Sequence, residues 1–280
     1  MKNRIMKTLL NRKSLQYKAL FGVFSFILIL TVFCGRPSAP EKVLATPFPV
    51  IDQLGNLREY RLFLPDQSGA SFPLLVYFHG VISPDFKTIP SLKKYTGSPI
   101  EETEWIPFCR ARRIALLVPE AKYEYTFLER RSKGWLTEKE LDGVEKIIDT
   151  VVERFTIDRN RIYLAGISAG AVFCHFLANN RPSYYSAIVS HSQAYVNERG
   201  EVLRPPIKGP QFGVVFCYNL GDYQQLIRFC IDSERLYRLE GYRTALLPDL
   251  PPRGHAWSAS NNARFWKLLQ RLGRKDEPAR

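Results

Sequence analysis

Three residues of this chain, Ser168, Asp222 and His255, have the side-chain types that nucleophilic catalysis requires. Ser168 occupies the centre of a Gly-x-Ser-x-Gly pattern that follows an apolar run and precedes a helical pattern. A strand, a sharp turn and a helix would present the serine hydroxyl at a sheet edge. Because a serine hydroxyl is a weak nucleophile, it needs a base and a group that orients the base. His255 and Asp222 suit these roles, since each follows a predicted strand in a loop with an adjacent glycine.

Other residues compete for these roles less well. Asp232 lies within a helical pattern and Asp249 lies beside the last predicted strand, so both are weaker candidates for the acid. His175 lies two turns beyond Ser168 on the predicted helix, which favours a packed histidine over a base. No cysteine pair has the Cys-x-x-Cys spacing of a zinc site, so we expect no metal.

The elements that must position these residues alternate between strands and helices. Buried apolar runs predict strands at 73–78, 114–118, 162–167, 187–190, 212–218 and 244–247. Helical spacing predicts helices at 137–155, after Ser168, at 224–239 and at 259–272, and residues 50–64 predict an edge hairpin. This alternation predicts an α/β fold whose mostly parallel sheet has helices on both faces. Ligands of such sheets bind beyond the carboxyl ends of the strands.

Several segments carry a resemblance to a known family. They are 58–65, Leu75-Val-Tyr-Phe-His79-Gly80, the run Asp158-Arg-Asn-Arg-Ile-Tyr-Leu-Ala-Gly-Ile-Ser168-Ala-Gly170, Gly221-Asp222 and Gly254-His255. On these residues the chain resembles α/β-hydrolases of the group that contains polyhydroxybutyrate depolymerases, feruloyl esterases and related secreted esterases. The resemblance spans about residues 58–257, and the order Ser168, Asp222, His255 is the order of that fold.

The resemblance implies that a carboxylic ester is hydrolysed through an acyl-serine intermediate without a metal or cofactor. It also implies an oxyanion hole made by the backbone N–H of Ala169 and that of Val81 or Ile82. The substrate would be a small-molecule or polymeric ester.

Further side chains near the same edge are candidates for contact with the substrate. His79, His191 and Trp257 follow predicted strands, and Trp135 lies in an aromatic segment at 119–136. That segment lines either the substrate cleft or an ordinary packed loop. The residues also leave two other functions open, a serine peptidase or amidase on the same fold and a non-catalytic binding protein of the cell envelope.

The amino-terminal segment carries much of the positive charge. Six of the 40 Lys and Arg residues lie in residues 1–34, which hold no acid, so the net charge of +13 falls to +7 without them. No array of basic and aromatic residues indicates nucleic-acid binding. We divide the chain into a signal peptide or anchor over 1–34, an extended linker over 35–50, the hydrolase domain over 51–273 and a frayed tail over 274–280.

An apolar stretch at 19–33 follows the basic start of the chain. It is shorter than the ~20 residues of a membrane-spanning helix and fits an export signal. Cys34 follows directly and resembles the lipid-attachment site of bacterial lipoproteins, while cleavage near Ala39 and an uncleaved anchor are the alternatives. In all three cases we expect the remaining chain outside the cytoplasm, at the cell envelope or secreted. An exported chain allows a disulfide at Cys109 or Cys230, so the sequence leaves a disulfide and free thiols as alternatives.

Overall fold

The computed structural model describes residues 42–65, 71–83, 97–127, 130–135, 138–197, 199–206, 211–249 and 254–273. The chain divides into two compact units, Met1–Pro40 and Glu41–Arg280, and every described residue belongs to the second unit. The predicted signal or anchor over 1–34, with Cys34, and the predicted tail over 274–280 lie outside the described residues.

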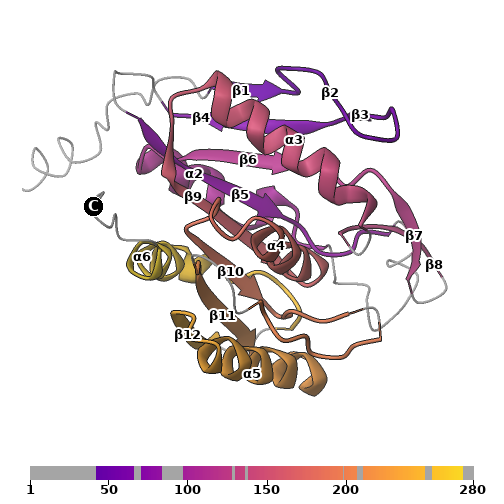
Figure 1. Ribbon diagram of the computed structural model, residues 1–280, viewed down its shortest axis with the longest axis vertical. Helices are drawn as coiled ribbons and strands as arrows, with labels where there is room; N and C mark the ends of the chain where they lie inside the picture. Colours follow the sequence, from indigo (N-terminus) through magenta and orange to yellow (C-terminus); the bar gives the residue numbers. More distant parts are fainter. Residues whose placement is uncertain are drawn as a thin grey trace, which may run out of the picture. The chain divides into compact units, whose positions relative to one another are not determined.

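An eight-stranded sheet forms the centre of the second unit, in the order β1-β4-β6-β5-β9-β10-β11-β12 (Figure 1). Its strands are β1 (Lys42–Ala45), β4 (Tyr60–Leu64), β5 (Phe72–Phe78), β6 (Ala115–Pro119), β9 (Ile157–Ile167), β10 (Ala187–His191), β11 (Gly213–Asn219) and β12 (Thr244–Asp249). β4 pairs antiparallel with β1 and β6, and the other neighbours are parallel. The predicted mostly parallel α/β sheet is therefore confirmed.

Helices cover both faces of this sheet, and successive side chains of the fully buried strand β5 pack alternately into two apolar clusters. Leu74, Val76 and Phe78 belong to one apolar cluster, and Leu75 and Tyr77 belong to the other. The first cluster includes side chains of α3 (Lys139–Arg154), α4 (Ala169–Asn180) and α5 (Gln224–Leu239). The second includes side chains of α2 (Trp105–Ala111) and α6 (Asn262–Leu272), and the short turns η2 (Ile100–Glu102) and η3 (Ala259–Asn261) precede these two helices. A strand that is apolar on both sides needs such double cover.

The structure differs from the expected linker over 35–50. Lys42–Ala45 form β1, which pairs antiparallel with β4 at the edge of the sheet. A four-residue strand is too short to show a side-chain pattern, so only its backbone pairing with β4 reveals it.

Two hairpins stand beside the main sheet. β2 (Val50–Ile51) pairs with β3 (Leu57–Arg58), and β7 (Glu124–Phe127) pairs with β8 (Arg130–Lys133). The predicted hairpin over 50–64 is thus confirmed only for its first part, because the second part continues into the main sheet as β4. β7 and β8 lie in the segment expected to be an aromatic loop, and a bridge between Ile82 and Lys133 joins β8 to the segment after β5.

A buried ion pair joins the first hairpin to α3. The fully buried Arg58 guanidinium donates to the Glu140 carboxylate and lies 3.7 Å from Asp52. Glu140 also accepts hydrogen bonds from the backbone N–H groups of Lys122 and Tyr123 at 2.8 and 2.7 Å. Glu140 lies in the first turn of α3 and there satisfies a buried positive charge.

Four cysteines are free thiols in the core, namely Cys109, Cys174, Cys217 and Cys230. The open question of a disulfide at Cys109 or Cys230 is therefore answered, and burial raises the pKa of both thiols. Within the described residues, no helix has both the length and the apolar character needed to cross a membrane.

Candidate active site

The carboxyl ends of three neighbouring strands meet beside Ser168. Ile167 at the end of β9 is in register with His191 of β10, which is in register with Cys217 of β11. The Ser168 N–H donates to the His191 carbonyl at 2.9 Å, which fixes the first residue after β9 against the end of β10. Parallel pairing therefore brings loops that are distant in sequence to one edge.

Ser168 occupies a strained turn between β9 and α4. Its backbone has φ 55° and ψ −122°, a conformation that non-glycine residues seldom adopt. The two flanking positions have no room for a side chain, which requires glycine at both. A Cβ at Gly166 would lie 2.3 Å from the Gly170 carbonyl oxygen, and one at Gly170 would lie 2.3 Å from the Phe78 carbonyl oxygen. The predicted strand-turn-helix around Gly-x-Ser-x-Gly is thus present, with the serine backbone held as such a turn requires.

Asp222 and His255 form a direct hydrogen bond at the same edge. His255 Nδ1 lies 3.0 and 2.9 Å from the two carboxylate oxygens of Asp222. The Asp222 side chain is fully buried, whereas 15% of the His255 side chain is exposed. Burial raises the pKa of Asp222, but the hydrogen bond and positive charge of His255 outweigh it, so the pKa lies below its usual value. The carboxylate therefore stays ionised and fixes the imidazole through Nδ1.

Ser192 is a member of this site that sequence reasoning missed. It is buried, follows β10 directly and has φ 55°, like Ser168. Its hydroxyl lies close enough to Asp222 to lower the pKa of that carboxyl, although without a well-aligned hydrogen bond. No motif marks this serine, because only strand register places it beside the acid.

Backbone contacts differ between Val81 and Ile82, the two alternatives for the oxyanion donor that would act with Ala169. The Ile82 N–H donates to the Lys133 carbonyl at 2.8 Å, so the prediction for Ile82 is corrected. The amides of Val81 and Ala169 donate to no other described residue. Ala169 is the first residue of α4, where backbone N–H groups lack partners within the helix. Within the described part of the chain, the Val81 and Ala169 amides are therefore available as donors at this edge.

The four predicted substrate contacts are buried beneath the edge. His79 turns Nδ1 to the Gly80 carbonyl oxygen at 2.6 Å, and Trp135 stacks on Phe173 with ring centroids 5.2 Å apart. The rings of His191 and Trp257 pack against each other at a tilt, with centroids 5.0 Å apart. None of the four exposes more than 5% of its surface. They support the site from the core, which differs from the expectation that they line it.

A second carboxylate organises the loop that carries His255. Asp249, at the end of β12, accepts hydrogen bonds from Asn219 (3.1 Å), Ser258 (2.6 Å) and Asn261 (2.7 Å). His191 Nε2 lies 4.0 Å from Asp249, and burial lowers the pKa of His191 to about 3, with His255 adding to the effect. Because Asp249 and Ser258 bracket His255, their hydrogen bond closes the base of its loop. The sequence shows Asp249 beside a strand but gives no sign of this network.

The fold that these features define is that of the α/β-hydrolases. The structure resembles a thermostable esterase at 18% identity, with a TM-score of 0.57 over 83% of this chain and 63% of that protein. It also resembles a ferulic acid esterase of Anaeromyces mucronatus, solved with ferulic acid, at 13% identity and a TM-score of 0.56 over 85% and 93% of the two chains. A substrate-bound, fluorophosphonate-binding serine hydrolase of Staphylococcus aureus matches at 14% identity and a TM-score of 0.55, over 84% and 100%.

One family model gives a narrower match. The model described as esterase PHB depolymerase matches residues 113–203, the segment that contains the Ser168 turn. The resemblance to polyhydroxybutyrate depolymerases is confirmed over that segment. No curated protein matches the chain at the level of sequence.

Proposed function

We propose that this protein is a serine hydrolase that cleaves carboxylic esters, with Ser168 as nucleophile, His255 as general base and Asp222 as the residue that orients the base. The observation that carries the proposal is the Asp222–His255 hydrogen bond at the edge where the strained Ser168 turn ends β9. The esterase family model over 113–203 and the esterases of the same fold support the chemistry.

The geometry supports a two-step acyl transfer. Ser168 Oγ attacks the ester carbonyl carbon while its proton passes to His255 Nε2, which is the ring nitrogen opposite the Asp222 contact. The carbonyl oxygen becomes an oxyanion that accepts hydrogen bonds from the N–H groups of Val81 and Ala169. His255 then returns the proton to the departing alcohol, which leaves an acyl-serine. A water molecule attacks that acyl group by the same route, releases the acid and restores Ser168.

The proposal is tested with purified protein, a fluorophosphonate probe and aryl esters of increasing acyl length. We expect the probe to form one adduct at Ser168 and the ester panel to be hydrolysed. Ser168→Ala should abolish both, because no other hydroxyl shares the Ser168 turn. Ser183→Ala is the matched control, since Ser183 is exposed and precedes the amino end of β10.

The outcomes separate the competing functions. Turnover of aryl amides or peptides in preference to esters would indicate a peptidase or amidase. A folded protein that forms no adduct and hydrolyses no ester would indicate a binding protein. Full ester hydrolysis by Ser168→Ala would contradict the proposed nucleophile.

A further inference from the structure

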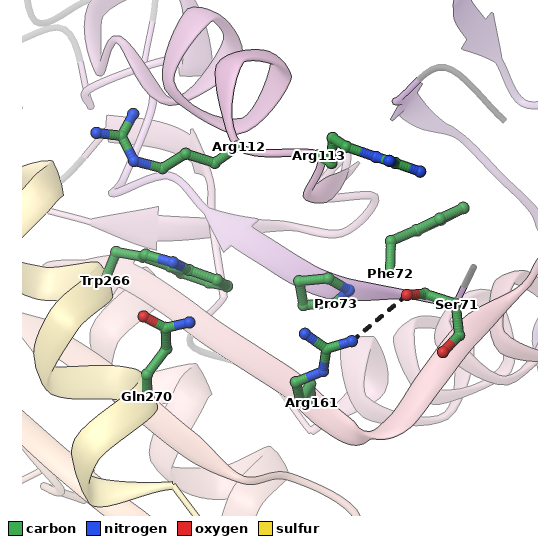
Figure 2. Close-up of a pocket in the computed structure, with 8 residues that line it drawn as sticks. All are labelled: Ser71, Phe72, Pro73, Arg112, Arg113, Arg161, Trp266 and Gln270. Atoms are coloured by element: carbon green, nitrogen blue, oxygen red, sulfur yellow. Dashed lines mark hydrogen bonds between the residues drawn. The ribbon is translucent and has the colours of Figure 1, made fainter. Parts of the chain in front are cut away.

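A cavity of about 190 Å³ opens at the start of β5 and beside the first half of β9, where Phe72, Pro73 and Arg161 line it (Figure 2). Ser168 follows the carboxyl end of β9, so most of that strand separates Arg161 from the serine. At about 3.3 Å per residue, this separation is roughly 20 Å. The cavity therefore lies outside the proposed acyl-transfer site, and side chains that contact the ester must lie at the carboxyl edge.

Two exposed apolar side chains flank the proposed catalytic acid at that edge. Leu220 and Tyr223 lie in the loop between β11 and α5, on either side of Asp222 in the chain, and expose 46% and 56% of their surface. The ring of Tyr223 lies beside the His255 ring, with centroids 6.4 Å apart. An apolar surface therefore borders the acid and the base. The other large apolar side chains exposed in the described residues lie on the first hairpin and on α5, namely Ile51, Leu54, Leu57, Ile231 and Leu239.

Backbone hydrogen bonds fix the loop that carries these two side chains. The Asn219 side chain accepts a hydrogen bond from the Gly221 N–H at 2.8 Å, and the Asn219 carbonyl accepts one from the Asp222 N–H at 3.0 Å. The Tyr223 N–H donates to the Asp222 carboxylate at 2.8 Å. Leu220 and Tyr223 are therefore held at the surface by an ordered loop.

Tyr223 occupies a position where the stability of the helix favours other residue types. It is the N-cap of α5, with φ −62° and ψ 131°, and its side chain makes no capping hydrogen bond. Serine, threonine, asparagine and aspartate are preferred at an N-cap, because their side-chain oxygen accepts a hydrogen bond from a free backbone N–H of the first turn. A half-exposed ring at this position does little for the fold, which favours contact with a ligand.

The order of the strands assigns the two parts of an ester to opposite sides of Ser168. β5 precedes Val81 and β12 precedes His255, and these strands lie on opposite sides of β9 in the sheet. A carbonyl oxygen that accepts from the Val81 N–H is therefore turned towards β5. The alcohol oxygen receives its proton from His255, so it lies on the other side. The carbons bonded to that oxygen then extend towards the loop that carries Tyr223.

We propose that Leu220 and Tyr223 bind the alcohol portion of the ester and select substrates in which this portion is apolar and carries a ring. The inference rests on the proposed ester hydrolysis through Ser168. A ring that leaves water to pack on exposed leucine and tyrosine side chains is stabilised, and an aromatic ring also packs well against the tyrosine ring. A sugar or a charged alcohol gains little from such a surface, because its polar groups find no partner there.

The test compares isomeric esters that place the same ring on opposite sides of the ester group. 2-Phenylethyl acetate carries the phenyl ring on the alcohol, methyl 3-phenylpropanoate carries it on the acyl group, and ethyl acetate carries no ring. We expect the parent chain to hydrolyse 2-phenylethyl acetate with a kcat/KM about tenfold or more above that for ethyl acetate, as the burial of part of a ring predicts. Methyl 3-phenylpropanoate should gain less, because its ring lies away from Tyr223.

The variant Leu220→Ser/Tyr223→Ser removes both apolar side chains and places a favoured residue at the N-cap of α5. It should lower kcat/KM for 2-phenylethyl acetate about tenfold relative to that for ethyl acetate. The ratio between methyl 3-phenylpropanoate and ethyl acetate should stay as in the parent chain. Tyr223→Phe keeps the ring and should keep the preference. The matched control is Leu239→Ser at the other end of α5, which removes a side chain that is 66% exposed and should behave like the parent.

The outcomes separate this inference from the proposed function. An equal loss on both ring-bearing isomers, or no loss on 2-phenylethyl acetate, would overturn the inference. Hydrolysis of ethyl acetate and a fluorophosphonate adduct at Ser168, without a preference for the ring on the alcohol, would contradict this inference alone. If no ester is hydrolysed and no adduct forms, the proposed function is wrong and this inference fails with it.

Discussion

At the scale of single residues, backbone space decides whether the Ser168 turn can form. A Cβ at Gly170 would lie 2.6 Å from the His79 carbonyl oxygen, as well as close to Phe78, while nothing lies within 4 Å of one at Gly254. We therefore expect Gly170→Ala to lower the free energy of unfolding by about 2 kcal/mol or more, through strain in the core. It should also reduce ester hydrolysis.

The matched control is Gly254→Ala, which also lies next to a proposed catalytic residue. We expect it to change the free energy of unfolding by about 0.5 kcal/mol or less. Urea unfolding followed by circular dichroism measures both variants. Equal free energies of unfolding for the two variants would show that the close backbone contact at Gly170 does not require glycine there.

Three buried histidines make stability depend on pH. Burial lowers the pKa of His79 to about 4 and that of His175 and His191 to about 3, while unfolded histidine titrates near 6.5. Below pH 6.5 the unfolded chain therefore binds more protons, and stability falls as the pH drops towards these folded values. Asp222, whose pKa is also lowered, adds a loss only below about pH 4.

The measurement is urea unfolding at intervals between pH 7 and pH 4.5. Each histidine contributes a slope of up to about 1.4 kcal/mol per pH unit. His175→Asn removes one of these groups, which hydrogen-bonds to Tyr237 and Ser190 away from the proposed nucleophile. The variant should show a shallower slope. If the stability of the parent chain does not change over this pH range, the buried histidines are not neutral in the folded chain, which would contradict the prediction.

At the scale of elements, the loop after β12 depends on Asp249. Asp249→Asn replaces an acceptor of three hydrogen bonds with an amide that must turn its own donors towards Asn219 or Asn261. We expect the His255 loop to loosen, which lowers kcat about tenfold. KM should change little, because Asp249 is fully buried and acts only through the loop. The rate of ester hydrolysis and the rate of fluorophosphonate labelling are both measured, and both should fall.

Two further variants define this prediction. Ser258→Ala removes one donor to Asp249 and should cost about 1 kcal/mol in unfolding free energy, with a smaller loss of kcat. Asp232→Asn, on the exposed side of α5, is the matched control and should leave kcat unchanged. If Asp249→Asn lowers stability but leaves kcat intact, the network is structural and does not position His255.

At the scale of the whole molecule, the proposed triad lies at the carboxyl edge of the parallel strands. The described chain enters the sheet at the opposite edge, where Lys42 of β1 pairs with Leu64 at the end of β4. We expect export and anchoring through residues 1–34, in line with the basic and apolar pattern there. The chain expressed in a bacterial host should then fractionate with membranes.

Mass spectrometry of the mature chain checks the mode of anchoring. Lipidation predicts a mature chain that begins at Cys34 with an added lipid mass, and Cys34→Ala should abolish it. A mature chain that begins after Ala39 and is released in soluble form would favour a cleaved signal instead. An unprocessed chain in the membrane would favour an uncleaved anchor.

The sequence by itself determined the class of fold and indicated the three residues of the proposed triad. The apolar runs predicted a mostly parallel sheet, and Ser168, Asp222 and His255 each follow one of its strands, so parallel pairing had to bring them to one edge. Such patterns are visible in the sequence because helix and strand periodicity depend on the spacing of neighbouring residues. The packed role of His175 was predictable for the same reason, since its helical position was known.

Tertiary structure decided everything that depends on contacts between distant segments. The Ile82 N–H donates to the Lys133 carbonyl, and Glu140 pairs with the buried Arg58. β1 exists only through its pairing with β4. The Asp249 network likewise joins residues from separate loops. No local pattern records such partners, because the free energy of a buried polar group depends on which donor or acceptor the fold places beside it.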